Sequence, residues 1–148
     1  WKMDRYGALA KWLAEKGGYR IVLNGSEKEE PLATEVIKSA GNFGVLNLCG
    51  RNSVRELMAV LSRADLMIGN DSGPAHIAAA LGTRTVALFS GTNNVGESAP
   101  VGTKTRVVRN EVPCSPCSLK ECGDYNHECM ENLTLEAVKQ SVQICKSL

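Results

Sequence analysis

The sequence predicts an α/β protein with a Rossmann-like parallel sheet flanked by helices. Short, nearly continuous apolar runs alternate with amphipathic segments at helical spacing, and glycine or proline stands at several of the junctions. Apolar strands that alternate with helices are typical of parallel sheets with right-handed crossover connections. In such sheets ligands bind beyond the carboxyl ends of the strands, so the loops 24–30, 69–76 and 90–98 are the first candidates for a site.

The predicted elements follow one another in this alternating order. The predicted strands cover residues 19–23, 44–49, 66–68, 85–89 and 105–109. A helix over residues 3–16 precedes them, and further helices begin near Pro31, Ser53, Pro74 and Thr134. These starts carry the expected signals: proline in the first turn, a capping box of Ser53 with Glu56, and a threonine cap.

Composition limits the classes of protein that this chain can represent. It has 148 residues, 43% of them hydrophobic, and 17 basic against 16 acidic residues, which leaves a formal net charge of +1. This length and apolar content suit a single domain over residues 1–148. The balanced charge disfavours nucleic acid as a partner, and no apolar run reaches the roughly 18 residues that a membrane span needs. The first residues lack the pattern of a secretory signal, so we expect a cytoplasmic protein, and the start at Trp1 instead of Met indicates a fragment.

The loop between the third strand and the next helix carries the strongest candidate binding site. Gly73 permits close approach of a ligand to the backbone, and free amides of Ala75 and His76 would favour an anion there. The carboxylate of Asp71 would repel a phosphate and suits the hydroxyl groups of a sugar better. The alternative is structural: Asp71 and Ser72 could merely cap the helix, and His76 could pack against backbone.

The loops after the first and fourth strands carry weaker signals. Glu27 follows the first strand, and a carboxylate there can accept both hydroxyls of a ribose. The simpler interpretation of its neighbours Glu29 and Glu30 is that their negative charges stabilise the N-terminus of the following helix. The same structural role is the alternative to ribose binding for Glu27. Thr92 lies in a small polar loop, residues 90–94, that could close over a ligand or serve only as a connection. The chain lacks a Walker motif, a G-x-G-x-x-G fingerprint and a nucleophile elbow.

Four of the six cysteines form a C-x2-C-x4-C-x6-C array: Cys114, Cys117, Cys122 and Cys129. The array lies in a Cys-rich loop, residues 112–130, that is inserted before the C-terminal helix. Four thiolates at this spacing could bind a structural zinc ion or an iron–sulfur centre. Two disulfides or free thiols are the competing interpretations. Cys49 and Cys145 are predicted to be buried as small apolar residues.

Residues 64–83, ADLMIGNDSGPAHIAAALGT, and residues 86–92, VALFSGT, resemble the bacterial heptosyltransferases of lipopolysaccharide core synthesis, glycosyltransferase family 9. The similarity is to their C-terminal, donor-binding domain and covers essentially the whole chain. It implies a GT-B fold of two Rossmann-like domains, of which this chain would supply the C-terminal half and lack the N-terminal acceptor domain. It further implies an inverting transfer of heptose from ADP-heptose to the lipopolysaccharide inner core, with no cofactor required for catalysis.

The resemblance implies six substrate-binding residues: Glu27, Asp71, Ser72, Gly73, His76 and Thr92. Asp71 would hold hydroxyls of the heptose, Glu27 would hold the ribose, and the others would line or support the sugar–diphosphate site. The catalytic base and a phosphate-binding lysine would lie outside this chain, which is therefore expected to be inactive alone. The full-length protein would associate peripherally with the inner face of the inner membrane.

Two other functions stay open on the sequence alone. A nucleotide-sugar epimerase would share the fold, but its D-S-G-G-x-x-E-E block is not matched where this chain has Pro74, His76 and Ala78. A non-catalytic binding module would use the Cys-rich loop for docking and would retain only a vestigial nucleotide crevice.

Overall fold

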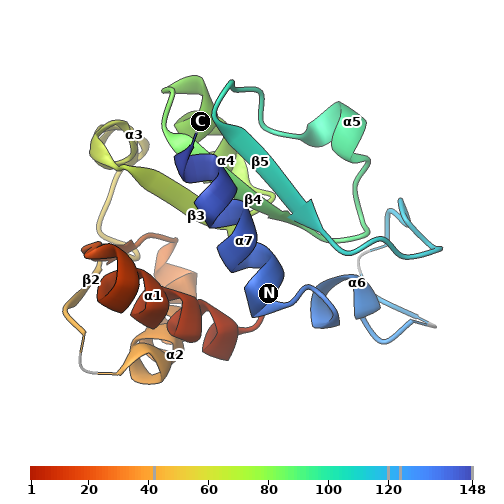
Figure 1. The fold of residues 1–148 in the computed structure, drawn as a ribbon, viewed down its shortest axis with the longest axis horizontal. Helices are drawn as coiled ribbons and strands as arrows, with labels where there is room; N and C mark the ends of the chain where they lie inside the picture. The colour runs from red at the N-terminus through yellow and green to blue at the C-terminus, as the bar shows by residue number, and fades with distance from the viewer. Residues whose placement is uncertain (42, 120, 124, 148) are drawn as a thin grey trace. The chain divides into compact units, whose positions relative to one another are not determined.

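The computed structural model describes residues 1–41, 43–119, 121–123 and 125–147 (Figure 1). The chain divides into two compact units, Trp1–Leu57 and Met58–Leu148, and each contains its own parallel sheet. Helices accompany the strands of both sheets, which confirms the predicted α/β class. Within the described ranges no helix is long and apolar enough to cross a membrane.

The first unit consists of a two-stranded sheet and its helices. Its elements are α1 (Met3–Gly17), β1 (Ile21–Leu23), the 3-10 helix η1 (Glu27–Glu29), α2 (Glu30–Ala40) and β2 (Val45–Asn47). β1 and β2 pair in parallel with Ile21 opposite Val45. Beyond the strands, the N–H of Gly50 donates to the carbonyl of Gly25 at 2.9 Å, so the two loops that follow β1 and β2 are joined.

α1 and α2 pack against each other through small and aliphatic side chains. The buried residues of the two helices are Gly7, Leu9, Ala10, Leu13, Ala33, Val36 and Ala40. Gly7 marks a close approach, because a Cβ built there would collide with the side chain of Ser39 and lie 2.9 Å from the backbone nitrogen of Ala40. A larger residue would have to push α2 away, so glycine sets the spacing of the two helices.

The second unit contains a three-stranded parallel sheet with β4 in the centre. Its strands are β3 (Leu66–Asn70), β4 (Arg84–Phe89) and β5 (Thr105–Arg109), in the order β3-β4-β5. Its helices are α4 (Gly73–Ala80), α5 (Val95–Ser98), α6 (Glu128–Glu131) and α7 (Leu135–Lys146), and α3 (Val54–Arg63) crosses the boundary between the units. α4 contacts β3 and β4, while α7 contacts β4 and β5 (Figure 1).

The core of the second unit surrounds β4. Consecutive residues from Val86 to Phe89 are buried, so both faces of this strand are covered. Ala87 and Phe89 pack with Ala75 of α4 in one apolar cluster. A central strand buried on both faces explains why the sequence shows a continuous apolar run here and no alternation.

The predicted elements are present, with shifted boundaries. All five predicted strands are found, and the first begins at Ile21 instead of residue 19. Among the described residues, β1 and β2 pair with each other in the first unit, and the other three strands pair in the second. The strands therefore form two sheets. η1, α5 and α6 were not predicted, since a single helical turn carries no apolar periodicity.

Two predicted helix caps are confirmed. The hydroxyl of Thr134 accepts a hydrogen bond from the N–H of Ala137 at 3.2 Å at the start of α7. The N–H and the hydroxyl of Ser53 both donate to the carboxylate of Glu56, at 2.8 and 2.7 Å, and so complete the capping box of α3.

We expect Gly7→Ala to destabilise the chain, although alanine is the better helix former. The added methyl group must overlap Ser39 or displace α2, which costs about 1–3 kcal/mol of unfolding free energy and outweighs the gain in helix propensity of about 1 kcal/mol. Urea denaturation followed by circular dichroism measures the change.

The matched control is Gly17→Ala, because Gly17 is exposed at the end of the same helix. This variant should be as stable as the parent or slightly more stable. If both alanine variants proved equally stable, the close approach of α1 and α2 at Gly7 would be contradicted.

Candidate functional site

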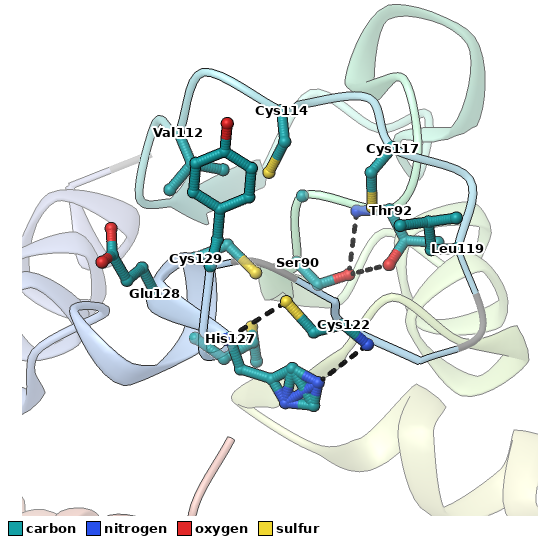
Figure 2. Close-up of a pocket in the computed structure, with 13 residues that line it drawn as sticks. Ser90, Thr92, Val112, Cys114, Cys117, Leu119, Cys122, His127, Glu128 and Cys129 are labelled. Atoms are coloured by element: carbon teal, nitrogen blue, oxygen red, sulfur yellow. Dashed lines mark hydrogen bonds between the residues drawn. The ribbon is translucent and has the colours of Figure 1, made fainter.

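A pocket of about 220 Å³ lies between the loop after β4 and the Cys-rich loop (Figure 2). Its lining includes all the cysteines of the array: Cys114, Cys117, Cys122 and Cys129. The N–H of Cys122 donates to Nε2 of His127 at 3.3 Å, and the N–H of His127 donates back to the Cys122 sulfur, also at 3.3 Å. Ser90, Gly91 and Thr92 contribute to the lining from the end of β4. Four cysteines that the sequence places in one loop therefore share one pocket.

The cysteines are free thiols in this structure. Cys49 and Cys145 are buried, as predicted. Partial burial and the neighbouring thiol of Cys117 raise the pKa of Cys114, which favours its protonated form. Over the ranges that the structure describes, no three His, Cys, Asp or Glu side chains are grouped so that they could hold a metal ion. Binding of zinc or an iron–sulfur centre by the array therefore stays a prediction.

The Cys-rich loop holds the loop after β4 in place. Main-chain hydrogen bonds run from the N–H of Cys117 to the Gly91 carbonyl at 2.9 Å and from the N–H of Ser118 to the Thr92 carbonyl at 3.0 Å. A Cβ at Gly91 would lie 3.1 Å from a methyl carbon of Val112, so glycine permits this contact. The loop containing Thr92 is thus a braced element, which the sequence left undecided.

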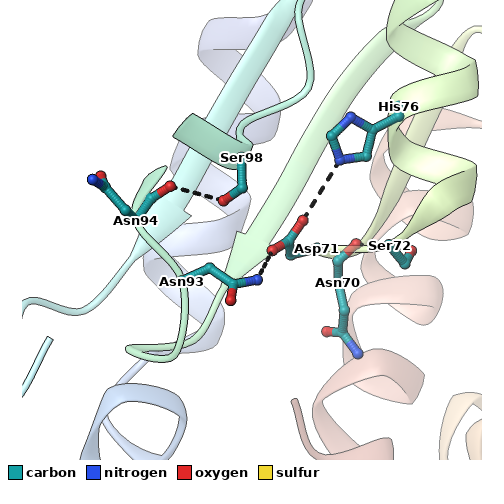
Figure 3. Close-up of polar contacts among 7 residues, drawn as sticks. All are labelled: Asn70, Asp71, Ser72, His76, Asn93, Asn94 and Ser98. Atoms are coloured by element: carbon teal, nitrogen blue, oxygen red, sulfur yellow. Dashed lines mark hydrogen bonds and ion pairs between the residues drawn. The ribbon is translucent and has the colours of Figure 1, made fainter. Parts of the chain in front are cut away.

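The turn after β3 and the loop after β4 meet at the carboxyl ends of two paired strands. β3 and β4 run parallel with Asn70 opposite Leu88. The N–H of Asp71 extends this pairing, since it donates to the Leu88 carbonyl at 3.0 Å. From the other loop, Nδ2 of Asn93 donates to Oδ2 of Asp71 at 2.7 Å (Figure 3). The sequence did not single out Asn93, because nothing near it in the chain indicates a partner 22 residues away.

The carboxylate of Asp71 lies between this loop and the first turn of α4. Nε2 of His76 is 3.7 Å from Oδ1, on the side opposite the Asn93 contact. The side chain of Asp71 is 17% exposed, and that of His76 is 47% exposed. An ionised carboxylate can accept about four hydrogen bonds, so Asp71 keeps acceptor positions for a ligand. Such an acceptor-only group matches hydroxyl donors, and it repels phosphate.

The first turn of α4 differs from the expectation. The amides of Ala75 and His76 are not free, because both donate to the Ser72 carbonyl, at 3.0 and 3.5 Å. The side chain of Ser72 does not cap the helix, since its hydroxyl donates to the Asn70 carbonyl at 3.1 Å. A Cβ at Gly73 would meet no described atom within 4 Å, so the backbone there is open to approach. The N-terminal end of α4 therefore offers a ligand the open backbone at Gly73 and the carboxylate of Asp71. It does not offer the free amides that were predicted.

Glu27 lies in the first unit, at the start of η1. It is exposed, and none of the hydrogen bonds or ion pairs among the described residues engages its carboxylate. Glu29 instead completes a capping box, because the N–H and the hydroxyl of Ser26 both donate to its Oε2 at 2.7 Å. These hydrogen bonds lower the pKa of Glu29. The structure therefore confirms Glu29 as a helix-start residue and leaves Glu27 available for a ligand.

The six predicted substrate-binding residues are divided between the two units. Glu27 belongs to Trp1–Leu57, and the other five belong to Met58–Leu148. Within the second unit, Asp71 and His76 are brought together, and Thr92 lies one residue from the Asn93 that contacts Asp71. A single donor site that includes both units stays a prediction.

The solved structures that resemble this chain define its class. It matches Escherichia coli ADP-heptose lipopolysaccharide heptosyltransferase II with a TM-score of 0.79 and 25% identity, over 99% of this chain and 41% of that chain. It matches a family 9 glycosyltransferase from Veillonella parvula with a TM-score of 0.83 and 22% identity, again over 99% and 41% of the two chains. The parallel sheets and helices are those of GT-B glycosyltransferases, as predicted.

Sequence similarity then identifies the family. The family model of glycosyltransferase family 9 (heptosyltransferase) matches residues 1–127. Lipooligosaccharide heptosyltransferase 2 of Campylobacter jejuni is 30% identical over 125 residues, which cover 83% of this chain and 40% of the relative. Lipopolysaccharide heptosyltransferase 2 of Escherichia coli K12 is 31% identical over 145 residues, which cover 96% and 41%. The chain belongs to glycosyltransferase family 9, and it spans 40% and 41% of the length of these curated relatives.

The capping box of Glu29 makes stability depend on pH in a defined direction. The pKa of Glu29 in the folded chain is lowered from its ordinary value of 4.5. The ionised carboxylate therefore adds to the free energy of unfolding above pH 4.5, and this stabilisation is lost as the pH falls through the pKa of the folded chain. We expect Glu29→Gln to reduce stability at neutral pH by about 0.3–1 kcal/mol, because glutamine can form the same capping box but lacks the negative charge that favours a helix N-terminus, and the difference should shrink in acid. Urea denaturation at a series of pH values measures it.

The control for this prediction is Glu35→Gln, which changes an exposed glutamate of α2 that forms no hydrogen bond or ion pair among the described residues. Its pH profile of stability should stay close to that of the parent. A Glu29→Gln difference that persists unchanged in acid would contradict the role of the ionised carboxylate.

Proposed function

We propose that this chain is the donor-binding half of a heptosyltransferase and that it binds ADP-heptose. The observation that carries the proposal is the Asp71 carboxylate, which lies at the end of β3 between Asn93 and His76 and keeps acceptor positions for sugar hydroxyls. Family membership supports a glycosyltransferase, and the similar proteins are named lipopolysaccharide or lipooligosaccharide heptosyltransferases. Membership of this family also disfavours the epimerase alternative.

In this proposal the parts of the donor bind to different loops. Asp71 accepts hydrogen bonds from the hydroxyl groups of the heptose, because an ionised carboxylate is an acceptor only. The diphosphate lies against the open backbone at Ser72 and Gly73 and near the hydroxyl of Thr92. Glu27, whose carboxylate is exposed, takes the hydroxyls of the ribose.

The proposed reaction is an inverting transfer of heptose to the lipopolysaccharide inner core. An acceptor hydroxyl forms a bond to C1 of the heptose while the bond from C1 to the ADP oxygen breaks, and a base outside this chain takes the hydroxyl proton. The residues of this chain hold the donor and stabilise part of the negative charge on the departing ADP. The chemical step as proposed requires no cofactor. Because the acceptor is carried on a lipid, we place the reaction at the inner face of the inner membrane.

We expect the chain to bind ADP weakly and ADP-heptose more tightly. Glu27→Ala should weaken the binding of both ligands about tenfold or more, because both contain the ribose, whereas Asp71→Ala should weaken only ADP-heptose. Isothermal titration calorimetry measures these affinities. Glu35→Ala, an exposed substitution in α2, is the control and should change neither. A non-catalytic docking module would bind no nucleotide at all, and that result would overturn the proposal.

The cysteine array carries a separate proposal, a structural zinc ion or iron–sulfur centre bound by the four thiolates: Cys114, Cys117, Cys122 and Cys129. Its support is their spacing and the pocket that they share. Since no three described metal-ligating side chains are grouped for an ion, the thiols would have to draw together on binding. No step of the proposed transfer depends on this centre.

Metal analysis tests this second proposal. Protein purified without chelators should contain about one equivalent of zinc, or iron together with acid-labile sulfide, per chain. Cys122→Ser should lower this content, whereas Cys49→Ser, which changes a buried cysteine outside the array, should not. A preparation with neither zinc nor iron would remove the proposal and leave thiols or disulfides, which titration with a thiol reagent distinguishes.

A further inference from the structure

The amide of Asn93 holds the carboxylate of Asp71 from the neighbouring loop. Nδ2 donates to Oδ2 at 2.7 Å (Figure 3). Among the described residues no other side chain is this close to the carboxylate, since Nε2 of His76 lies 3.7 Å from Oδ1, beyond hydrogen-bond range. We propose that Asn93 is a positioning residue for donor recognition, which orients Asp71 toward the sugar of a bound nucleotide sugar. This inference rests on the proposed function.

A neutral amide is well suited to this role. An aspartate side chain rotates about two bonds, so an unheld carboxylate loses conformational freedom when it binds a sugar. The hydrogen bond from Asn93 removes part of that freedom before the ligand arrives. A lysine or arginine in its place would also neutralise the negative charge of the carboxylate. The neutral amide of Asn93 occupies one acceptor position of Asp71 and leaves that charge in place.

The backbone on either side of Asn93 is fixed by other contacts. On one side, the carbonyls of Gly91 and Thr92 accept main-chain hydrogen bonds from the Cys-rich loop. On the other side, the main-chain carbonyl of Asn94 accepts hydrogen bonds from the N–H groups of Glu97 and Ser98 at 3.1 and 3.0 Å, which attach it to α5. The loop therefore presents the Asn93 amide to Asp71 from an anchored backbone, as preorganisation requires.

Titration calorimetry of the chain with ADP and with ADP-heptose tests the inference. Asn93→Ala should weaken ADP-heptose binding about fivefold to tenfold and leave ADP binding unchanged. Asn93→Asp keeps the shape of the side chain, loses the donor and adds a like charge, so it should weaken ADP-heptose at least as much. In the Asp71→Asn background, Asn93→Ala should cause no further loss, because Asn93 acts through Asp71.

Asn94→Ala is the matched control. Asn94 lies in the same loop but contacts α5 (Figure 3), so its loss should leave ADP-heptose binding close to that of the parent. An equal loss from Asn94→Ala would assign the effect to the loop as a whole and overturn the inference. Independent, additive losses from Asn93→Ala and Asp71→Asn would also overturn it, because Asn93 would then contact the sugar itself.

The same titrations separate this inference from the proposed function. If Asp71→Asn weakens ADP-heptose binding and Asn93→Ala does not, the role of Asn93 is wrong and the proposed function stands. If the parent chain binds neither ligand, both are wrong. Thermal unfolding of each variant confirms that a loss of binding is not a loss of folded protein.

Discussion

One hydrogen bond at the end of two parallel strands determines where the candidate site forms. The N–H of Asp71 donates to the Leu88 carbonyl at 3.0 Å and continues the pairing of β3 with β4 beyond the strand. The Asp71 carboxylate therefore emerges beside the loop that follows β4, within reach of Asn93. Because β4 is a buried central strand, a slip of one residue would carry its side chains to the wrong faces of the sheet. The position of the site thus depends on the core of the second unit.

The Cys-rich loop supports the candidate site because it is attached to the loop that follows β4. None of its described residues is fully buried, so apolar packing alone does not account for its position. Main-chain hydrogen bonds to the carbonyls of Gly91 and Thr92, and the close contact of Val112 with Gly91, attach it to the loop after β4. The pocket lined by the four cysteines of the array lies against the same loop. The Cys-rich loop is therefore part of the structure that holds the loop after β4, whatever the state of its thiols.

Local sequence signals were reliable where the interactions they describe are local. The capping box that begins at Ser53 and the Thr134 cap are both present, since each joins residues three positions apart. The expectation of free amides at Ala75 and His76 was wrong, because the Ser72 carbonyl is placed to accept from both. The motif around these residues was still sufficient to recognise the family, because a motif records residue types and not the hydrogen bonds that they form.

The sequence alone determined the α/β class, the order of the principal helices and strands, and the family, because hydrophobic periodicity, caps and motifs are properties of neighbouring residues. Only the tertiary structure decided that Asn93 bonds to Asp71, that the Cys-rich loop bonds to Gly91, and that the four cysteines of the array line one pocket. The first two of these contacts join residues far apart in the chain. Their physical basis is the register of parallel strands and the paths of the loops that leave them, which no local pattern of residues encodes.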